Sequence, residues 1–400
     1  MNARYVSLAI VMVVAGAIVP SLAAQSAPAK RVASSQPTLT AAQGLPLTCA
    51  QAWIASEKNY AQMRALVITQ HGPPEVLKVL DRPDPEVGRG AVRIAVKAAG
   101  VNFSDLLARV GMYPEAPKPP SVIGYEVSGD VESVGDGVED VKPGDRVIAG
   151  TRFGGQAELA VTDAGNVFPL PDGWSYEKGA SVPVVYVTAY AGMIRFGNVL
   201  EGERVLIHAA AGGVGIAATQ IGKHLGAELY GTASAAKHDA IRGFGIEHPI
   251  DYHSQDFVKE IRRITSEKRP LDLVMDAVGG SSFRKSWSLL RAGGRLVAFG
   301  VSESGGGERR EIAKALKMLA TSPIFPILTM MRDSKSVIGL NMLALQDTKG
   351  LGDYIRPLTE LMERGIVDPV VAEAFPVERA ADAHRYLSER KNVGKVVLTF

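Results

Sequence analysis

One stretch near the middle of the chain, residues 201–226, most constrains what this sequence can fold into. It begins with a short apolar run, Val205 to Ile207, which suits a buried parallel strand. Three glycines follow at positions 212, 213 and 215, and residues 214–225 are apolar enough for about three helical turns. A strand, a glycine turn and a helix in this order predict a parallel α/β unit.

The glycine turn is also suited to hold phosphate. Glycine lacks a Cβ, so the backbone can approach a pyrophosphate and the helix can pack closely on the strand. The helix N-terminus adds unpaired N–H groups and a partial positive charge. The residues that we expect to bind a dinucleotide here are Ala211, Gly212, Gly213, Val214 and Gly215. The spacing differs from the common Gly-x-Gly-x-x-Gly, so the alternative is a tight turn without a ligand.

Strand and helix patterns alternate from Val184 to about Leu340, which predicts an α/β fold with a doubly wound parallel (Rossmann) sheet of about six strands. The expected strands are 204–209, 228–232, 248–251, 271–277, 295–300 and 336–340, with helices such as 257–265 and 281–290 between them. We therefore predict a cofactor-binding domain at residues 184–340.

The preceding part of the chain is rich in short strands separated by proline and glycine turns. The expected strands are 64–68, 91–96, 126–134, 146–149 and 155–161, with one helix near 105–110. We predict a β-rich domain at residues 63–183 that forms one wall of the active site. Residues 341–400, with helices at 354–364 and 376–390 and a last strand near 392–398, are expected to return to it.

Composition excludes some classes of function. The net charge of +2 gives no reason to expect a nucleic-acid partner. Cys49 is the only cysteine, which excludes a disulfide within the chain and a zinc site built from cysteines.

The first 62 residues allow two interpretations. Residues 1–24 have the charged start, apolar core and small-residue cleavage site of a secretory signal peptide, and 25–62 look like a linker. Alternatively, translation starts at Met63, so that residues 1–62 are not part of the translated protein and the protein is cytoplasmic. The second interpretation is motivated by chemistry, because reduced nicotinamide cofactors are cytosolic reagents.

Several ordered motifs resemble one superfamily. They are Ala-Gly-Val-Asn-Phe-Ser-Asp at 99–105, Gly-Met-Tyr-Pro at 111–114, Gly-Tyr-Glu at 124–126 and Val-Lys-Pro-Gly-Asp-Arg-Val at 141–147. Together they resemble the medium-chain dehydrogenases/reductases, and more narrowly the zinc-free quinone oxidoreductases of the zeta-crystallin type. The cofactor half and the C-terminus resemble the branch of the synaptic vesicle amine transport protein homologues. The resemblance spans 63–400 and implies a GroES-like catalytic domain, a Rossmann domain and a homodimer.

The motifs depart from the zinc-dependent members of this superfamily. Those members carry Gly-His-Glu and a cysteine ligand, whereas this chain has Tyr125 in the middle position and no cysteine after Cys49. We therefore expect no metal. Without a metal to polarise a carbonyl, alcohol oxidation loses its usual electrophile. Reduction of a quinone or an activated double bond needs only a hydride, a hydrogen-bond donor for the developing oxyanion and a proton.

The end of the second cofactor-domain strand favours NADPH. NAD-preferring sites usually place an acidic residue here, but residues 230–237 contain none and include Ser234 and Lys237. The resemblance implies that Lys237 and Tyr252 bind the 2′-phosphate. The alternatives are that Lys237 is a solvated surface lysine and that Tyr252 only packs against its neighbours.

Other site residues are weaker predictions. The resemblance places Thr188, Phe299, Gly300 and Val301 beside the nicotinamide, and Lys395 or Arg390 can meet a phosphate. The candidates for orienting a carbonyl or relaying a proton are Asn102, Tyr113 and Tyr125. The alternatives are that Asn102 is a helix cap and that the two tyrosines only pack in the core. His208 is expected to be a hydrogen-bonded core residue.

The leading hypothesis is an NADPH-dependent reductase of quinones or α,β-unsaturated carbonyls. A second is an NADPH-binding interaction protein with little turnover, because no residue is a convincing general acid. A third is an enoyl reductase that acts on carrier-linked acyl chains. The apolar run at 322–331 is expected to be exposed, and can line the substrate entrance, form a subunit contact or touch a membrane.

Overall fold

The computed structural model describes residues 61–305, 307 and 309–400, without the side chains of 348 and 349. The predicted signal peptide, its cleavage site and Cys49 lie outside these residues. Within the described part, no helix is both long and apolar enough to cross a membrane.

The predicted Rossmann sheet is present. Its six strands are β9 (Arg204–Ile207), β10 (Glu228–Ala233), β11 (His248–Asp251), β12 (Leu271–Asp276), β13 (Leu290–Ala298) and β14 (Ser336–Gly339). They are all parallel, in the order β11-β10-β9-β12-β13-β14. The strand order reverses between β9 and its neighbour β12. In such sheets ligands bind at the carboxyl ends of the strands beside this reversal.

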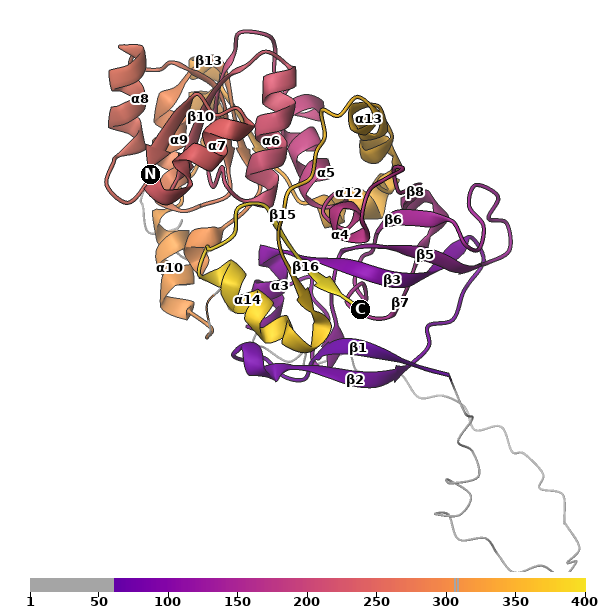
Figure 1. Cartoon of the computed structure of the whole chain (residues 1–400). Coiled ribbons are helices and arrows are strands. Elements are labelled where there is room, and N and C mark those ends of the chain that lie inside the picture. Colours follow the sequence, from indigo (N-terminus) through magenta and orange to yellow (C-terminus); the bar gives the residue numbers. More distant parts are fainter. Residues whose placement is uncertain (1–60, 306, 308) are drawn as a thin grey trace, which may run out of the picture. The chain divides into compact units, whose positions relative to one another are not determined.

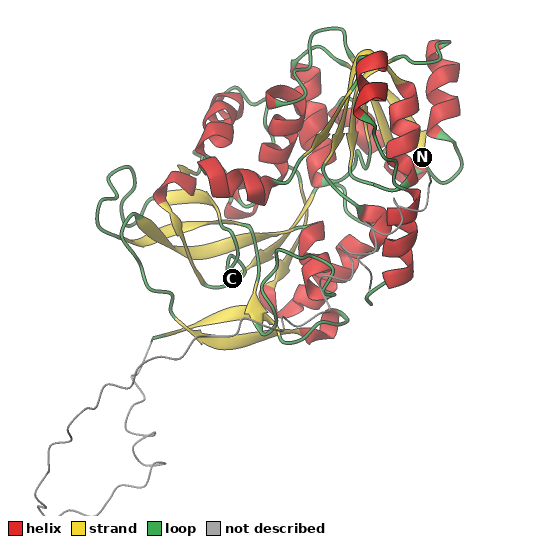
Figure 2. Ribbon diagram, turned by 180° about the vertical axis from the view of Figure 1, so that it is seen from behind, coloured by secondary structure: helices red, strands yellow, loops and turns green. Residues whose placement is uncertain are grey.

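Helices flank both faces of this sheet (Figure 2). They include α6 (Gly213–His224), α7 (His238–Phe244), α8 (Phe257–Thr265) and α9 (Ser281–Leu289). Strand β9 shows why: Val205 and Ile207 join the core cluster that contains Ala217 of α6, whereas Leu206 joins the cluster on the other face with Leu289 of α9. The apolar residues of β9 therefore serve two cores, as expected for a strand buried on both faces.

The β-rich part contains two further sheets. One is mixed, in the order β15-β16-β3-β5-β6-β8 with β7 paired to β3, and the other is β2-β1-β4. Their strands are β1 (Gln62–Ile68), β2 (Leu77–Pro83), β3 (Ala91–Val101), β4 (Ser121–Val122), β5 (Glu126–Val134), β6 (Arg146–Gly150), β7 (Leu159–Asp163), β8 (Val167–Pro169), β15 (Val371–Pro376) and β16 (Lys395–Thr399). The C-terminal strand β16 pairs antiparallel with β3, so the end of the chain lies in the β-rich sheet (Figure 1).

The remaining helices connect these sheets. They are α3 (Phe103–Arg109), α4 (Tyr176–Gly179), α5 (Val185–Tyr190), α10 (Ile312–Thr321), α11 (Ile327–Asp333), α12 (Met342–Lys349), α13 (Gly352–Glu363) and α14 (Ala380–Ser388). The sequence prediction missed four strands and four helices, namely β2, β4, β8, β15, α4, α5, α7 and α12. Part of the apolar run at 322–331 forms α11.

Two strand glycines provide a test of the packing of β5 against β3. A Cβ at Gly129 would overlap the carbonyl group of Ala95, with 2.9 Å to its carbon, whereas a Cβ at Gly339 in β14 would meet nothing within 4 Å. We expect Gly129→Ala to lower the free energy of unfolding by about 1–3 kcal/mol because strand β3 must move. The matched control Gly339→Ala should leave it unchanged or slightly higher, since alanine costs less backbone entropy. Denaturant unfolding measures both, and equal stability of the two variants would contradict this view of the sheet.

Candidate active site

The glycine turn between β9 and α6 is built for close approach. Ala209 has a φ of 53°, and a Cβ at Gly215 would overlap the Ala209 carbonyl oxygen and lie 2.6 Å from Cα of Ala210. A Cβ at Gly213 would lie 2.9 Å from Val185 Cγ1. The turn therefore has no room for side chains at these positions. The exposed backbone forms a cradle of the kind that a dinucleotide pyrophosphate needs.

The C-terminal return of the chain touches this turn. The backbone N–H of Gly394 donates to the carbonyl oxygen of Ala211 at 2.9 Å, and Gly212 and Gly394 form an isolated parallel bridge. Gly394 has a φ of +103°, and a Cβ there would lie 3.0 Å from the carbonyl carbon of Val370. Residue 394 therefore requires glycine and connects the turn to β16.

Cationic and aromatic groups gather near the carboxyl ends of β10 and β11. Lys237 Nζ donates to the carbonyl oxygens of Arg390 at 2.5 Å and Asn392 at 2.7 Å. Burial, and then the charge of Arg390, lower the pKa of Lys237. The Arg390 guanidinium lies 6.0 Å from the centre of the Tyr252 ring, which is 38% exposed. Ser234 precedes this group and accepts from the Lys237 backbone N–H at 2.9 Å through its carbonyl.

The residues predicted for the nicotinamide end lie at the carboxyl end of β13 and on α5. Phe299 N donates to the Asp276 carbonyl at 3.1 Å, and a Cβ at Gly300 would lie 2.9 Å from the Ala277 carbonyl oxygen, so Gly300 and Val301 pass close to β12. The buried Thr188 donates its hydroxyl hydrogen to the Val184 carbonyl at 2.7 Å.

A buried ion pair lies where the β-rich part meets α5. Lys395 Nζ is 2.6 Å from Glu126 Oε1, and both side chains are at most 4% exposed. Asn102 donates from Nδ2 to the same oxygen at 2.9 Å and accepts from Lys395 on Oδ1. The Val184 backbone N–H donates to Glu126 Oε2 at 2.7 Å. A Cβ at Gly100 would lie 2.7 Å from Glu126 Cδ, so glycine leaves room for the carboxylate.

This cluster contains residues that the sequence assigned elsewhere. Lys395 was expected at a phosphate and Asn102 at a substrate carbonyl, yet the side chains of both bond to each other and to Glu126. The sequence prediction did not include Glu126. An acid at the start of an apolar strand, directly after Gly-Tyr, was the available signal.

The two predicted tyrosines lie together. The rings of Tyr113 and Tyr125 meet edge-on with centres 6.3 Å apart, and Phe153 packs against Tyr125 at 5.5 Å. Burial raises the pKa of Tyr113 to about 12 and also raises the pKa of Tyr125. The buried Tyr125 hydroxyl has no hydrogen-bond partner among the described residues. Both hydroxyls therefore stay protonated near neutral pH and can act as donors.

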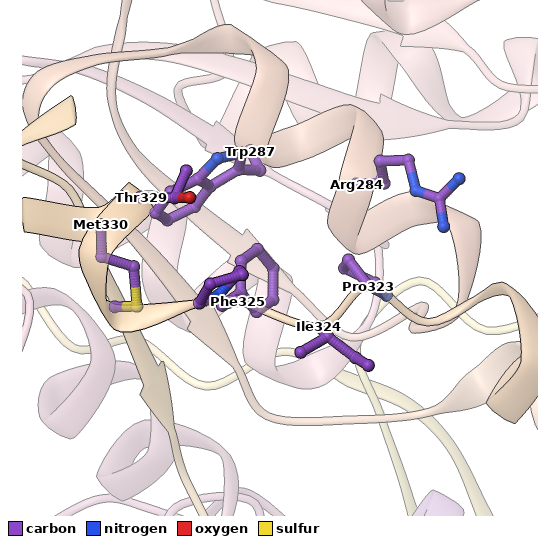
Figure 3. A pocket seen from close by; sticks show the side chains of 8 residues that line it. Arg284, Trp287, Pro323, Ile324, Phe325, Thr329 and Met330 are labelled. Carbon is purple, nitrogen blue, oxygen red and sulfur yellow. The ribbon is translucent and has the colours of Figure 1, made fainter. Parts of the chain in front are cut away.

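Two other features lie outside this group. His208 is buried and bonds to Thr232 at 3.0 Å and Ser286 at 3.2 Å, which confirms the expected core histidine. The run at 322–331 is exposed at five of its ten positions, with Leu328 74% exposed, and half-buried at the other five. A hollow of about 270 Å³ is lined by six residues of this run together with Arg284 and Trp287 (Figure 3). None of the predicted site residues lines it.

Among the described residues, no group of three or more histidine, cysteine, aspartate or glutamate side chains is arranged to hold a metal ion.

The parallel sheet with its glycine turn, joined to a β-rich part, defines a nicotinamide-dependent oxidoreductase. Comparison with known proteins supports this class. Residues 88–172 match the alcohol dehydrogenase GroES-like domain, and residues 244–398 match the zinc-binding dehydrogenase family.

Individual relatives are similar along most of the chain. The synaptic vesicle membrane protein VAT-1 homolog of Danio rerio is 36% identical over 348 residues, which cover 86% of this chain and 72% of the relative. The quinone oxidoreductase structure of Pseudomonas syringae is 31% identical with a TM-score of 0.72, covering 84% of this chain and 100% of the other. A mycobacterial protein solved with NADPH is 30% identical with a TM-score of 0.73 and the same coverage.

The chain therefore belongs to the medium-chain dehydrogenase/reductase family, as a zinc-free member of the VAT-1 and quinone oxidoreductase type. It has the GroES-like and Rossmann parts that the sequence predicted, and its class of reaction is NAD(P)-dependent oxidoreduction.

The buried ion pair makes a sharp prediction. Lys395→Met leaves Glu126 buried without its cation, and we expect the free energy of unfolding to fall by about 3–5 kcal/mol. The double variant Lys395→Met/Glu126→Gln removes both charges and should recover part of this loss. Chemical denaturation of wild type, both single variants and the double variant gives the coupling energy. Strictly additive losses would show that the two charges do not depend on each other.

Proposed function

We propose that this protein is an NADPH-dependent reductase of quinones or α,β-unsaturated carbonyls. The observation that carries the choice of cofactor is the group formed by Lys237, Arg390 and Tyr252 at the ends of β10 and β11. An ammonium, a guanidinium and an exposed aromatic ring suit a dianionic 2′-phosphate. Residues 230–237 contain no acid that would prefer a free ribose hydroxyl.

The glycine cradle fits the rest of the cofactor. In this proposal the turn at 211–215 receives the pyrophosphate, Ser234 and Lys237 the adenosine phosphate, and Thr188 with residues 299–301 the nicotinamide end. The close contacts at Gly213 and Gly215 support the assignment, because the chain places backbone rather than side chains there. When bound, NADPH supplies the hydride.

The chemistry of the β-rich side suits a conjugated acceptor. Tyr113 and Tyr125 are neutral phenols, and a phenol that stays protonated can donate a hydrogen bond to an oxygen as negative charge develops on it. The ammonium of Lys395 lies in the neighbouring cluster, although Glu126 neutralises most of its field. We assign the substrate side to the domain at 63–183 with the return at 341–400, and the cofactor side to 184–340.

We also propose a homodimer, on family analogy alone. The second candidate function is NADPH binding with little turnover, which is favoured by the hydrogen bonds that both polar atoms of the Asn102 side chain make within the buried cluster. Oxidation of NADPH with a panel of quinones and enones distinguishes the two, because only the reductase consumes NADPH.

The lysine at the end of β10 tests the cofactor assignment. We expect Lys237→Met to lower kcat/KM for NADPH by about ten- to a hundred-fold, because a charged hydrogen bond is worth about 1.5–3 kcal/mol. The value for NADH should change little. Lys259→Met, at an exposed lysine on α8, is the matched control and should behave as wild type. Initial rates from NADPH absorbance measure all three, and an equal loss with both cofactors would remove Lys237 from the phosphate site.

A further inference from the structure

A buried carboxyl group beside the ion pair has an unusual set of partners. Asp105, in the first turn of α3, is completely buried. Its Oδ2 accepts from the Asn102 backbone N–H at 2.7 Å and from Gln156 Nε2 at 3.3 Å. Asp105 Oδ1 and Gln156 Oε1 have no hydrogen-bond partner among the described residues. Two paired side chains thus each leave one buried oxygen unsatisfied, which is costly in a protein interior.

One proton satisfies both oxygens. A carboxylic acid and a primary amide can pair through two hydrogen bonds, one from the amide N–H to the acid and one from the acid O–H to the amide oxygen. The first of these bonds is present between Gln156 and Asp105. We propose that Asp105 is a neutral carboxylic acid in the folded protein near neutral pH, that Oδ1 donates its proton to the Gln156 amide oxygen, and that this proton supplies the proposed reduction.

The surrounding groups explain why Asp105, and not Glu126, holds the proton. Glu126 receives donors from Lys395, Asn102 and Val184, so its negative charge is well satisfied. Asp105 receives only neutral donors. The pKa of Asp105 is raised to about 7, chiefly by burial. The Asn102 backbone N–H, Lys395 and Gln156 oppose this rise, and the negative charge of Glu126 adds to it. The other titratable groups nearby, Tyr113 and Tyr125, feel the Asp105 charge and are themselves neutral.

The proton has a use in the proposed reaction, and this part of the inference rests on the proposed function. Hydride addition to a quinone or enone carries both electrons and leaves one negative charge on the substrate oxygen. We assign the proton for that oxygen to Asp105, whose O–H bond breaks, and its route to the Tyr125 hydroxyl, which lies close enough to feel the Asp105 charge and which passes its own proton to the substrate oxygen as it receives the new one. The resulting Asp105 carboxylate is stabilised by Lys395, which acts electrostatically on it. A proton from solvent then restores the acid.

The protonation state has a direct spectroscopic test. Infrared difference spectra of the full chain, wild type minus Asp105→Asn, should contain the carbonyl stretch of a protonated carboxylic acid, separate from the carboxylate bands. This band should disappear as the pH rises through about 7. Asp81→Asn, at an exposed aspartate in β2, is the matched control and should remove no such band. A wild-type spectrum with only carboxylate bands below this pH would overturn the inference, and would favour an ionised Asp105 solvated by internal water.

The role of the proton is tested by turnover. Asp105→Asn keeps the shape of the side chain and the acceptor for Asn102, so we expect it to fold, and its thermal unfolding checks this. Its kcat with a quinone or enone should fall about a hundred-fold, the loss typical of removing a general acid. The KM for NADPH should stay unchanged, and the decline of wild-type kcat above about pH 7 should vanish in the variant. Unchanged kcat and pH profile would overturn the proton supply.

The two arms separate the two proposals. An acid band without NADPH oxidation across the panel would contradict the proposed function and leave the protonated Asp105 standing. Turnover without an acid band would contradict this inference alone.

Discussion

The ion pair between Lys395 and Glu126 is the interaction on which the rest of the site depends. Burying either charge alone is costly, so the two side chains must meet, and four elements have to be in place for them to do so. Glu126 comes from β5, Lys395 from β16, Asn102 from the start of α3 and the Val184 N–H from the start of α5. Gly394, next to Lys395, bonds to Ala211 in the glycine turn. One buried pair thus fixes the β-rich side relative to the cofactor turn.

The same cluster creates an uneven distribution of charge. Glu126 takes the cation and two neutral donors. Asp105, one helical turn from Asn102, is fully buried and is left with neutral partners alone. Two carboxyl groups so close together cannot both ionise easily, so their environments push their proton affinities apart. Both carboxyl groups are equally buried, so burial alone cannot make their proton affinities differ. The difference arises from the donors that face each group.

Local patterns were enough to predict the cofactor half. Apolar runs of strand length, the glycine turn and the helix at 257–265 depend on neighbouring residues, so the sequence predicted six parallel strands and most of their bounds. Strands β2 and β15 were missed because they lie at edges of their sheets and keep few buried residues. Residues whose partners lie far away in sequence were harder. Lys395 and Asn102 are 293 positions apart, and nothing local indicates that their side chains meet.

The buried cluster also helps to explain why a family member without the zinc motif would reduce a conjugated acceptor rather than oxidise an alcohol. The zinc-dependent motif Gly-His-Glu reads Gly-Tyr-Glu here, and its glutamate, Glu126, bonds to an ammonium. An ammonium carries positive charge but has no open coordination position, so it cannot polarise an alcohol oxygen as a Lewis acid does. A conjugated acceptor makes a smaller demand, because its oxygen needs only a hydrogen-bond donor and a proton as charge arrives. The neutral phenol of Tyr125, in the position of the motif's histidine, can meet the first need, and a protonated Asp105 can meet the second.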